Sequence, residues 1–165
     1  MNDEVYRQIL EDEMATTSLA KALSRVAEPG DLIALSGDLG AGKSTLARAF
    51  IREALGDPEA EVPSPTFTLV QEYDHPDGYA LFHADLYRLS AGDDIEDLGL
   101  EDEQDNAVML IEWPDRLPMG WHNNVLGVAL ELRAPGSGER LLTLRFANEA
   151  WRAKLQSIGL LGARA

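Results

Sequence analysis

The sequence predicts an α/β fold, in which a sheet of mixed parallel and antiparallel strands is flanked by helices. One observation is a predicted strand over residues 31–35 with a continuous apolar core. A glycine-rich turn joins it to a helical pattern over residues 44–55, and Gly56 ends this helix. This order is typical of parallel strands covered on both faces. A second observation is that two later pairs of apolar runs are separated by turn-forming residues, which predicts antiparallel hairpins. The 165 residues contain no internal repeat and no low-complexity linker, so we expect one domain over residues 1–165.

The first elements of the chain are predicted to be a strand and a helix. Residues 6–10 have the composition of a short strand. Residues 16–27 place leucine, valine and alanine side chains at helical spacing, and Thr16 or Thr17 is a candidate N-cap for this helix. The dipeptide Pro29-Gly30 predicts that the helix ends before the first buried strand.

The second half of the chain is predicted to be richer in strands. Residues 62–65, with two prolines, predict a stiff extended connector. Residues 107–111 form a buried type of strand that Trp113-Pro114 ends, and Asn148 is a candidate cap for a last helix over residues 149–158. The two predicted hairpins pair residues 66–73 with 79–86 across a turn at 75–78, and residues 125–132 with 141–146 across a turn at 135–138.

The charge of the chain argues against nucleic acid as a direct partner. The sequence has 29 acidic and 14 basic residues, and its formal net charge is −15. Affinity for DNA or RNA rests on clustered lysine and arginine side chains that contact phosphates, and the sequence has no basic stripe. We therefore expect no tight binding to nucleic acid by this chain alone. If it serves a nucleic acid, a partner must carry the basic surface.

Other compositional features narrow the class of protein. The chain has no cysteine, which excludes disulfides, thiolate metal sites and cysteine nucleophiles. It has no apolar run near the ~20 residues that span a membrane, and no charged-then-apolar leader. We therefore expect a cytoplasmic protein without a membrane association. Eight of the thirteen residues from Asp93 to Asp105 are acidic. This run fits a solvated surface, and it also fits a docking surface for a basic partner.

The glycine-rich turn fits the phosphate-binding loop pattern G-x-x-x-x-G-K-[ST] at every constrained position. Glycines let consecutive backbone N–H groups form a concave nest for phosphate oxygens, and the next helix points its N-terminus at them. Lys43 adds a positive charge for the outer phosphates, and the Ser44 hydroxyl is placed to hold Mg²⁺. The predicted nucleotide-binding residues are Gly37, Asp38, Leu39, Gly40, Ala41, Gly42, Lys43, Ser44 and Thr45.

Two carboxylates stand at the ends of predicted strands. Asp85 lies near the end of the run over residues 79–86, where a carboxylate reaches Mg²⁺ directly or through water in P-loop proteins. The alternative for Asp85 is an ion pair with Arg88 or a helix cap. Glu112 directly follows the run over residues 107–111. A carboxylate at this position could ligate Mg²⁺ or orient the attacking water. The alternative for Glu112 is a side chain that leaves the sheet for solvent.

Three further groups of side chains are candidates for the same site. Thr66 follows a proline-stiffened turn, which suits a switch loop that senses the terminal phosphate, but ordinary strand entry fits equally well. His83 shares a strand face with Asp85 by period-two spacing. Since no third metal ligand is evident, we expect His83 to be a hydrogen-bonded structural residue. Arginines 88, 116 and 140 could each approach phosphates, and the sequence does not choose among them.

Together, four segments of the chain resemble the TsaE family, also called YjeE, in order and approximate spacing. The resemblance runs from about Asp12 to Glu112 and weakens after Pro114. Two departures are Ser44, where the family often has threonine, and Ala84, where it is often aromatic. The segments are Gly37–Thr45, Ser64–Val70 (SPTFTLV), His83–Leu89 (HADLYRL) and Glu112-Trp113-Pro114.

The resemblance implies a small cytoplasmic P-loop ATPase that binds ATP and Mg²⁺. Family members are ATPase subunits of the bacterial system that makes threonylcarbamoyladenosine in tRNA. They associate with the TsaB–TsaD heterodimer, whose TsaD subunit transfers the threonylcarbamoyl group to an adenosine beside the anticodon. The ATPase is thought to reset that complex between turnovers and does not perform the transfer.

The resemblance also implies roles for individual residues. The loop from Gly40 to Thr45 would cradle the phosphates, with Lys43 neutralising them and Ser44 ligating Mg²⁺. Asp85 and Glu112 would be the acidic pair at the metal and the water. Thr66 would lie in the switch segment, and Thr16 falls where the family's N-terminal segment approaches the nucleotide. This set makes Lys43, Thr66, Asp85 and Glu112 the predicted catalytic residues.

Three other functions stay open from the sequence. A small P-loop kinase could phosphorylate a metabolite, although the region from Ser90 to Asn106 is acidic where such kinases carry an arginine-rich lid. A GTPase is disfavoured because the chain has no Asn-Lys-x-Asp motif. A nucleotide sensor without turnover would share the site and lack only hydrolysis.

Overall fold

The computed structural model of the chain describes residues 3–38, 40–89, 95–134 and 136–161. The described residues form three α-helices, namely α1 (Glu13–Val26), α2 (Lys43–Leu55) and α3 (Glu149–Ser157). The strands are β1 (Glu4–Leu10), β2 (Leu32–Ser36), β3 (Val70–Asp74), β4 (Ala80–Asp85), β5 (Ala107–Glu112), β6 (Val125–Leu132) and β7 (Arg140–Phe146). Short 3₁₀ helices cover Ile95–Leu98, Glu101–Glu103 and Pro114–Arg116. The predicted α/β class and the predicted order of elements are confirmed.

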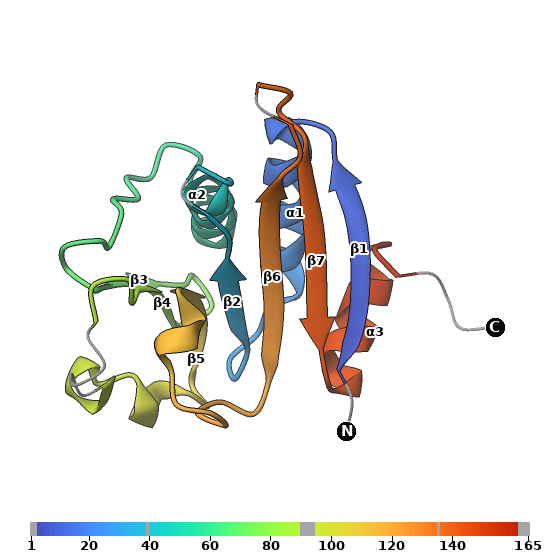
Figure 1. The fold of residues 1–165 in the computed structure, drawn as a ribbon. Coiled ribbons are helices and arrows are strands. Elements are labelled where there is room, and N and C mark those ends of the chain that lie inside the picture. The colour runs from blue at the N-terminus through green and yellow to red at the C-terminus, as the bar shows by residue number, and fades with distance from the viewer. Residues whose placement is uncertain (1–2, 39, 90–94, 135, 162–165) are drawn as a thin grey trace.

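All seven strands form one mixed sheet in the order β1-β7-β6-β2-β5-β4-β3 (Figure 1). The four strands β6, β2, β5 and β4 run parallel, while β3, β7 and β1 pair antiparallel at the two sides. The chain leaves β2 toward one side of the sheet and returns to β6 on the other side. The carboxyl end of β2 is therefore a topological switch point, the place where open α/β sheets bind their ligands.

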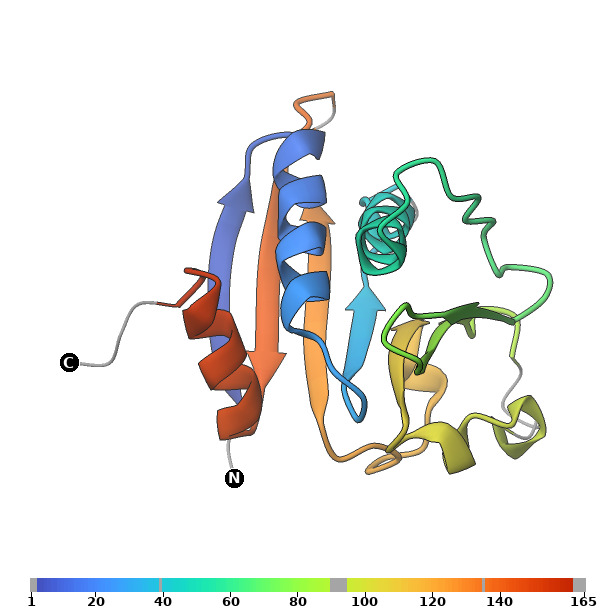
Figure 2. The ribbon, with the colours of Figure 1, turned by 180° about the vertical axis from the view of Figure 1, so that it is seen from behind.

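The three helices pack on the same face of the sheet, as the view from behind shows (Figure 2). Their buried side chains join Leu35, Leu110 and Val128 from the central strands in one apolar cluster. The other face of β2, β5 and β4 is covered by the irregular segments that follow β4 and β5, through residues such as Leu86 and Leu100. This explains the continuous apolar runs, because β5 is buried along its full length.

Two predicted boundaries are wrong, and each has a local cause. The first helix begins at Glu13 and not at Thr16, because the Asp12 side chain caps it by accepting a 2.8 Å hydrogen bond from the Ala15 N–H. Thr16 and Thr17 are therefore inside the helix. The first hairpin strand begins at Val70 and not at residue 66, because Leu69 has a left-handed φ of 68° that interrupts the extended backbone.

An ion pair between Asp31 and Lys154 lies at the amino end of β2. The Asp31 carboxylate is fully buried just before β2 and accepts hydrogen bonds from Lys154 Nζ at 2.7 Å and from the Glu28 N–H at 2.9 Å. Asn124 donates to the same carboxylate. Burial lowers the pKa of Lys154, but the hydrogen bonds to Asp31 and Glu28 outweigh burial and raise that pKa above its usual value. Helix α3 is thereby tied to the central strand.

Within the described part of the chain, none of the helices has the length and the apolar character needed to cross a bilayer.

Candidate nucleotide-binding site

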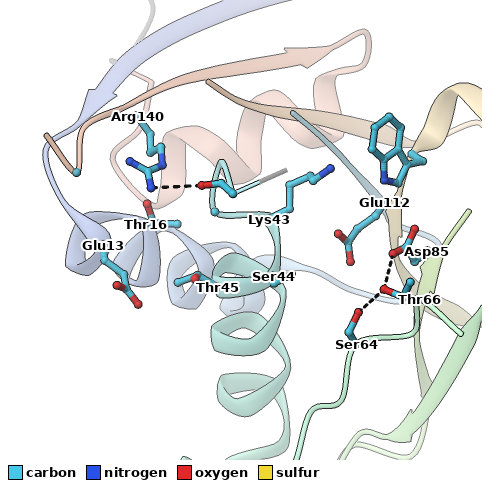
Figure 3. Close-up of a pocket in the computed structure, with 14 residues that line it drawn as sticks. Glu13, Thr16, Lys43, Ser44, Thr45, Ser64, Thr66, Asp85, Glu112 and Arg140 are labelled. Carbon is cyan, nitrogen blue, oxygen red and sulfur yellow. Dashed lines mark hydrogen bonds between the residues drawn. The ribbon is translucent and has the colours of Figure 1, made fainter. Parts of the chain in front are cut away.

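A pocket of about 330 Å³ opens at the carboxyl ends of the central strands (Figure 3). Its lining comes from six parts of the chain. These are the first turn of α1, the phosphate loop with the start of α2, the segment before β3, the end of β4, the end of β5 and the start of β7. The sequence-predicted residues that line it are Thr16, Gly40, Gly42, Lys43, Ser44, Thr45, Thr66, Asp85 and Glu112. The predicted residues Gly37, Asp38 and Ala41 support the loop from outside this lining, and Leu39 lies outside the described residues.

The phosphate loop needs its glycines for conformation and for space. Gly37, Gly40 and Gly42 have φ values of 137°, 81° and 110°, a region that side-chain-bearing residues rarely adopt. Gly42 is the N-cap of α2, so the first N–H groups of this helix face the pocket without a side-chain cap. The loop packs against the end of β6, where a Cβ atom on Gly37 would overlap the Leu130 carbonyl oxygen.

Gly37→Ala is expected to weaken ATP binding strongly and to destabilise the fold by about 2–5 kcal/mol, since strain and overlap add. Gly40→Ala is the matched control. It also has a positive φ that a side chain would strain, but a Cβ atom there would meet nothing within 4 Å. Titration calorimetry with ATP and thermal unfolding of both variants check this expectation. Equal effects of the two substitutions would contradict the role of the Leu130 contact.

Lys43 lies at the centre of the pocket and is almost fully buried. Its Nζ donates a 2.6 Å hydrogen bond to the Gly37 carbonyl and lies 4.3 Å from the centre of the Trp113 ring. Among the described residues, no carboxylate forms an ion pair with it. A buried ammonium with one carbonyl partner has donors left for an anion, and the pocket is where that anion would lie.

Asp85 is the last residue of β4, and both of its carboxylate oxygens accept hydrogen bonds. Oδ1 accepts a 3.0 Å hydrogen bond from the Tyr87 N–H, and Oδ2 accepts one at 3.2 Å from the Thr66 hydroxyl. Thr66 in turn shares a 2.7 Å hydrogen bond with Ser64, so the segment before β3 is attached to the end of β4 (Figure 3). The alternative ion pair with Arg88 is absent from the described contacts. Arg88 instead lies over the Phe67 ring, 5.2 Å from its centre.

Glu112 is the direct neighbour of Asp85 in the register of the parallel strands β4 and β5. It is buried, so the alternative of a side chain that leaves the sheet for solvent is wrong. Its Oε2 lies 2.8 Å from Nε2 of His83, which is also buried. An ionised carboxylate only accepts, so His83 carries the proton on Nε2 and donates it in this bond. His83 thereby fixes the rotamer of Glu112 at the pocket wall.

Helix α1 and the start of β7 form the opposite end of the pocket. Glu13 is exposed in the first turn of α1, and Thr16 is buried one turn later. The earlier start of α1 therefore places Thr16 inside a helix that borders the pocket. Arg140 donates to carbonyl groups of the phosphate loop (Figure 3). Lys43 lies in the middle of the site, Arg140 lies at the α1 end, and carboxylates stand at both ends.

The residues around Asp85 fit Mg²⁺ that arrives with a nucleotide. The donors at this end are all oxygen: the carboxylates of Asp85 and Glu112 and the hydroxyls of Ser44 and Thr66. No group of three or more His, Asp or Glu side chains that could hold a metal ion occurs in the described part of the chain. Mg²⁺ is commonly held by one or two carboxylates together with substrate phosphates and waters, which matches this donor set.

Two residues of the pocket, Glu13 and Arg140, were not singled out from the sequence. The expectation that His83 is a hydrogen-bonded residue is confirmed, and its partner is Glu112. The sequence did not show which of Arg88, Arg116 and Arg140 approaches the phosphates. Among these three, only Arg140 lines the pocket. Glu13 carried no signal except its place near the helix start. Part of the acidic run forms the 3₁₀ helices between β4 and β5, and its first residues, Asp93 and Asp94, lie outside the described residues.

Comparisons with known proteins agree with one another. A family model described as "Threonylcarbamoyl adenosine biosynthesis protein TsaE" matches residues 10–140. The protein of that name from Streptomyces coelicolor is 40% identical over 141 residues, which cover 76% of this chain and 93% of the relative. The one from Rickettsia felis is 39% identical over 107 residues, which cover 65% of this chain but only 61% of the relative. A crystal structure of YdiB from Bacillus subtilis superposes with a TM-score of 0.71 at 28% identity and covers 96% of each chain. The family match spans the phosphate loop and both acidic strand ends, and the chain belongs to the TsaE family.

Proposed function

We propose that this chain is a cytoplasmic subunit that binds and hydrolyses ATP and so supports threonylcarbamoyladenosine modification of tRNA by acting on a TsaB–TsaD heterodimer. The observation that carries the proposal is one pocket with two facing halves. Lys43 and Ser44 of the phosphate loop form one half, and Asp85 and Glu112, neighbours on β4 and β5, form the other. Family membership supplies the biological context.

In this proposal the phosphate loop binds the triphosphate through its N–H groups, and Lys43 neutralises the outer phosphates. Mg²⁺, held by Ser44, Asp85 and Glu112, would supply positive charge at the phosphate oxygens. Glu112 orients a water molecule and accepts its proton as the water oxygen attacks the γ-phosphorus. The bond from the γ-phosphorus to the bridging oxygen breaks, and ADP leaves. The hydrogen bond from His83 keeps Glu112 aimed at the pocket during this step.

Thr66 connects the site to the surface of the molecule. Its hydroxyl is bonded to Asp85, while the next residue, Phe67, is 83% exposed. A change in the surroundings of Asp85 would therefore be transmitted to the exposed aromatic side chain of the next residue in the same loop. We propose that ATP orders this loop for partner docking and that hydrolysis releases it.

Hydrolysis by the isolated chain is expected to be slow. Among the described residues that line the pocket, Arg140 is the one arginine, and it lies at the end away from Asp85 and Glu112. An arginine at the transferring phosphoryl group adds about 10³–10⁵ in rate, so its absence there predicts dependence on partners.

The test is ATP turnover by the purified chain with and without the TsaB–TsaD heterodimer, together with nucleotide affinity in both conditions. We expect the heterodimer to change the rate or the affinity by at least about tenfold. If the heterodimer changes neither quantity, the switch proposal fails. Transfer of labelled γ-phosphate to a metabolite and not to water would favour a small-molecule kinase instead.

A further inference from the structure

Arg140 crosses from the start of β7 to the phosphate loop. Its Nε donates a 2.8 Å hydrogen bond to the Ala41 carbonyl, and its Nη2 lies 3.5 Å from the Gly40 carbonyl. The third nitrogen, Nη1, donates at 3.2 Å to the carbonyl of the preceding residue, Glu139, which fixes the plane of the guanidinium. The side chain thus joins two parts of the chain that are 99 residues apart.

We propose that Arg140 is a positioning residue for the phosphate loop, which it holds in the conformation that receives the α- and β-phosphates. The planarity of the peptide bond links the Ala41 carbonyl to the direction of the next N–H group. In a trans peptide the C=O and the next N–H point in opposite directions. Because Arg140 binds the Ala41 carbonyl on one side, the Gly42 N–H points to the other side, and Gly42 lines the pocket. A donor for phosphate is therefore oriented before any ligand arrives.

The packing around Gly42 supports this assignment. A Cβ atom on Gly42 would lie 3.9 Å from Arg140 Nε and 3.7 Å from Leu130 Cδ1, so the loop is in contact with both strands of the second hairpin. The Ala41 N–H is already used, in a 3.0 Å hydrogen bond to the Asp38 carbonyl. The Lys43 Nζ also donates to the Gly37 carbonyl, so the loop keeps its shape through internal hydrogen bonds and through Arg140, which holds it from outside.

An arginine suits this position better than a lysine does. The guanidinium presents several N–H groups in a fixed plane, so it can hold a loop carbonyl and its own neighbouring carbonyl together. Lysine at position 140 would retain the positive charge near the phosphates but not the fork. Arg140→Lys therefore separates the effect of loop positioning from the effect of charge.

This inference rests on the proposed ATP binding, and the experiment separates the two. The affinities of the full chain for ATP, ADP and adenosine are measured by calorimetry for the wild type, Arg140→Ala, Arg140→Lys and the control Arg145→Ala. Arg145 is an exposed arginine at the other end of β7. If the wild type binds no nucleotide, the proposed function fails. If it binds nucleotide and Arg140→Ala binds equally well, only the present inference fails.

We expect Arg140→Ala to weaken the binding of ATP and of ADP by a similar factor of about 10–100, which is the effect of a charge-assisted hydrogen bond. The affinity for adenosine should stay unchanged. Arg140→Lys should recover only part of the loss, and Arg145→Ala should match the wild type. The value of kcat at saturating ATP should stay within about twofold, since Arg140 acts on binding. Loss of ATP affinity with ADP unaffected, or a large fall in kcat, would overturn the inference by placing Arg140 at the γ-phosphate. If Arg140→Ala does not fold, the ATP-to-ADP comparison for Arg140→Lys decides the question.

Discussion

Glu112→Gln is expected to slow ATP hydrolysis by about 10²–10⁴-fold, the usual contribution of a positioned general base, while ATP still binds. Glutamine has the shape of glutamate and still offers His83 an acceptor, but it cannot take a proton from water. The variant should therefore accumulate as an ATP complex. Single-turnover hydrolysis and ATP affinity, measured side by side, check the two halves of this expectation.

The matched control for this experiment is Glu131→Gln. Glu131 is an exposed glutamate on β6, outside the pocket lining, so its substitution makes the same change in net charge. Turnover by this variant should equal that of the wild type. A Glu112→Gln protein that kept normal turnover would remove Glu112 from the mechanism and leave Asp85 as the carboxylate to test.

Lys154→Met is expected to lower the free energy of unfolding by about 3–5 kcal/mol, because it leaves the buried Asp31 carboxylate without its cation. Methionine keeps most of the apolar stem and its packing, so the loss of stability measures the contribution of the positive charge. For a chain of this size the loss corresponds to a fall of roughly 10 °C in the unfolding midpoint. Circular dichroism melts of the variant and the wild type measure it.

Lys21→Met controls for the loss of an exposed lysine, since Lys21 lies at the surface of α1. It should leave the midpoint almost unchanged. The pKa of Lys154 is raised in the folded state, so its contribution is complete below the usual value of 10.5 and is lost as pH rises through the folded-state pKa. The stability difference between wild type and Lys154→Met should therefore shrink above about pH 10.5 and not at neutral pH. A difference that stays constant into that range would contradict the ion-pair account.

The parts of the fold that the sequence predicted well are those with strong local signals. The phosphate loop is defined by residue types at fixed spacing, and the pattern needs no knowledge of the rest of the chain. The Asn148 cap was predicted for the same reason, and its side chain accepts from the Trp151 N–H. The start of α1 was misplaced because Asp12, Thr16 and Thr17 are all good caps, and only the geometry shows which side chain reaches a free N–H.

Residues of the site could be identified from the sequence, but their contacts with one another could not. Asp85 and Glu112 were each found at a strand end, but their adjacency depends on β4 and β5 being neighbours in the sheet, which hydrophobic periodicity does not encode. The contact between His83 and Glu112 follows from the same register. Arg140 reaches the loop because β7 pairs with β6 beside β2, an arrangement fixed by long-range packing. Sequence reasoning therefore identified the chemical groups better than their partners.

The position of β2 in the sheet has a consequence for the synthesis of the protein. Strand β2 ends at Ser36, but its two neighbours, β5 and β6, begin only at Ala107 and Val125. The phosphate loop therefore leaves the ribosome before β6, the strand that supports it, and Arg140 follows Ala41 by 99 residues. Contacts between such distant segments form slowly and late in folding. We expect the nascent chain to hold an open, unsupported loop until β7 has emerged, so that the capacity to capture ATP appears only after Arg140 has been made.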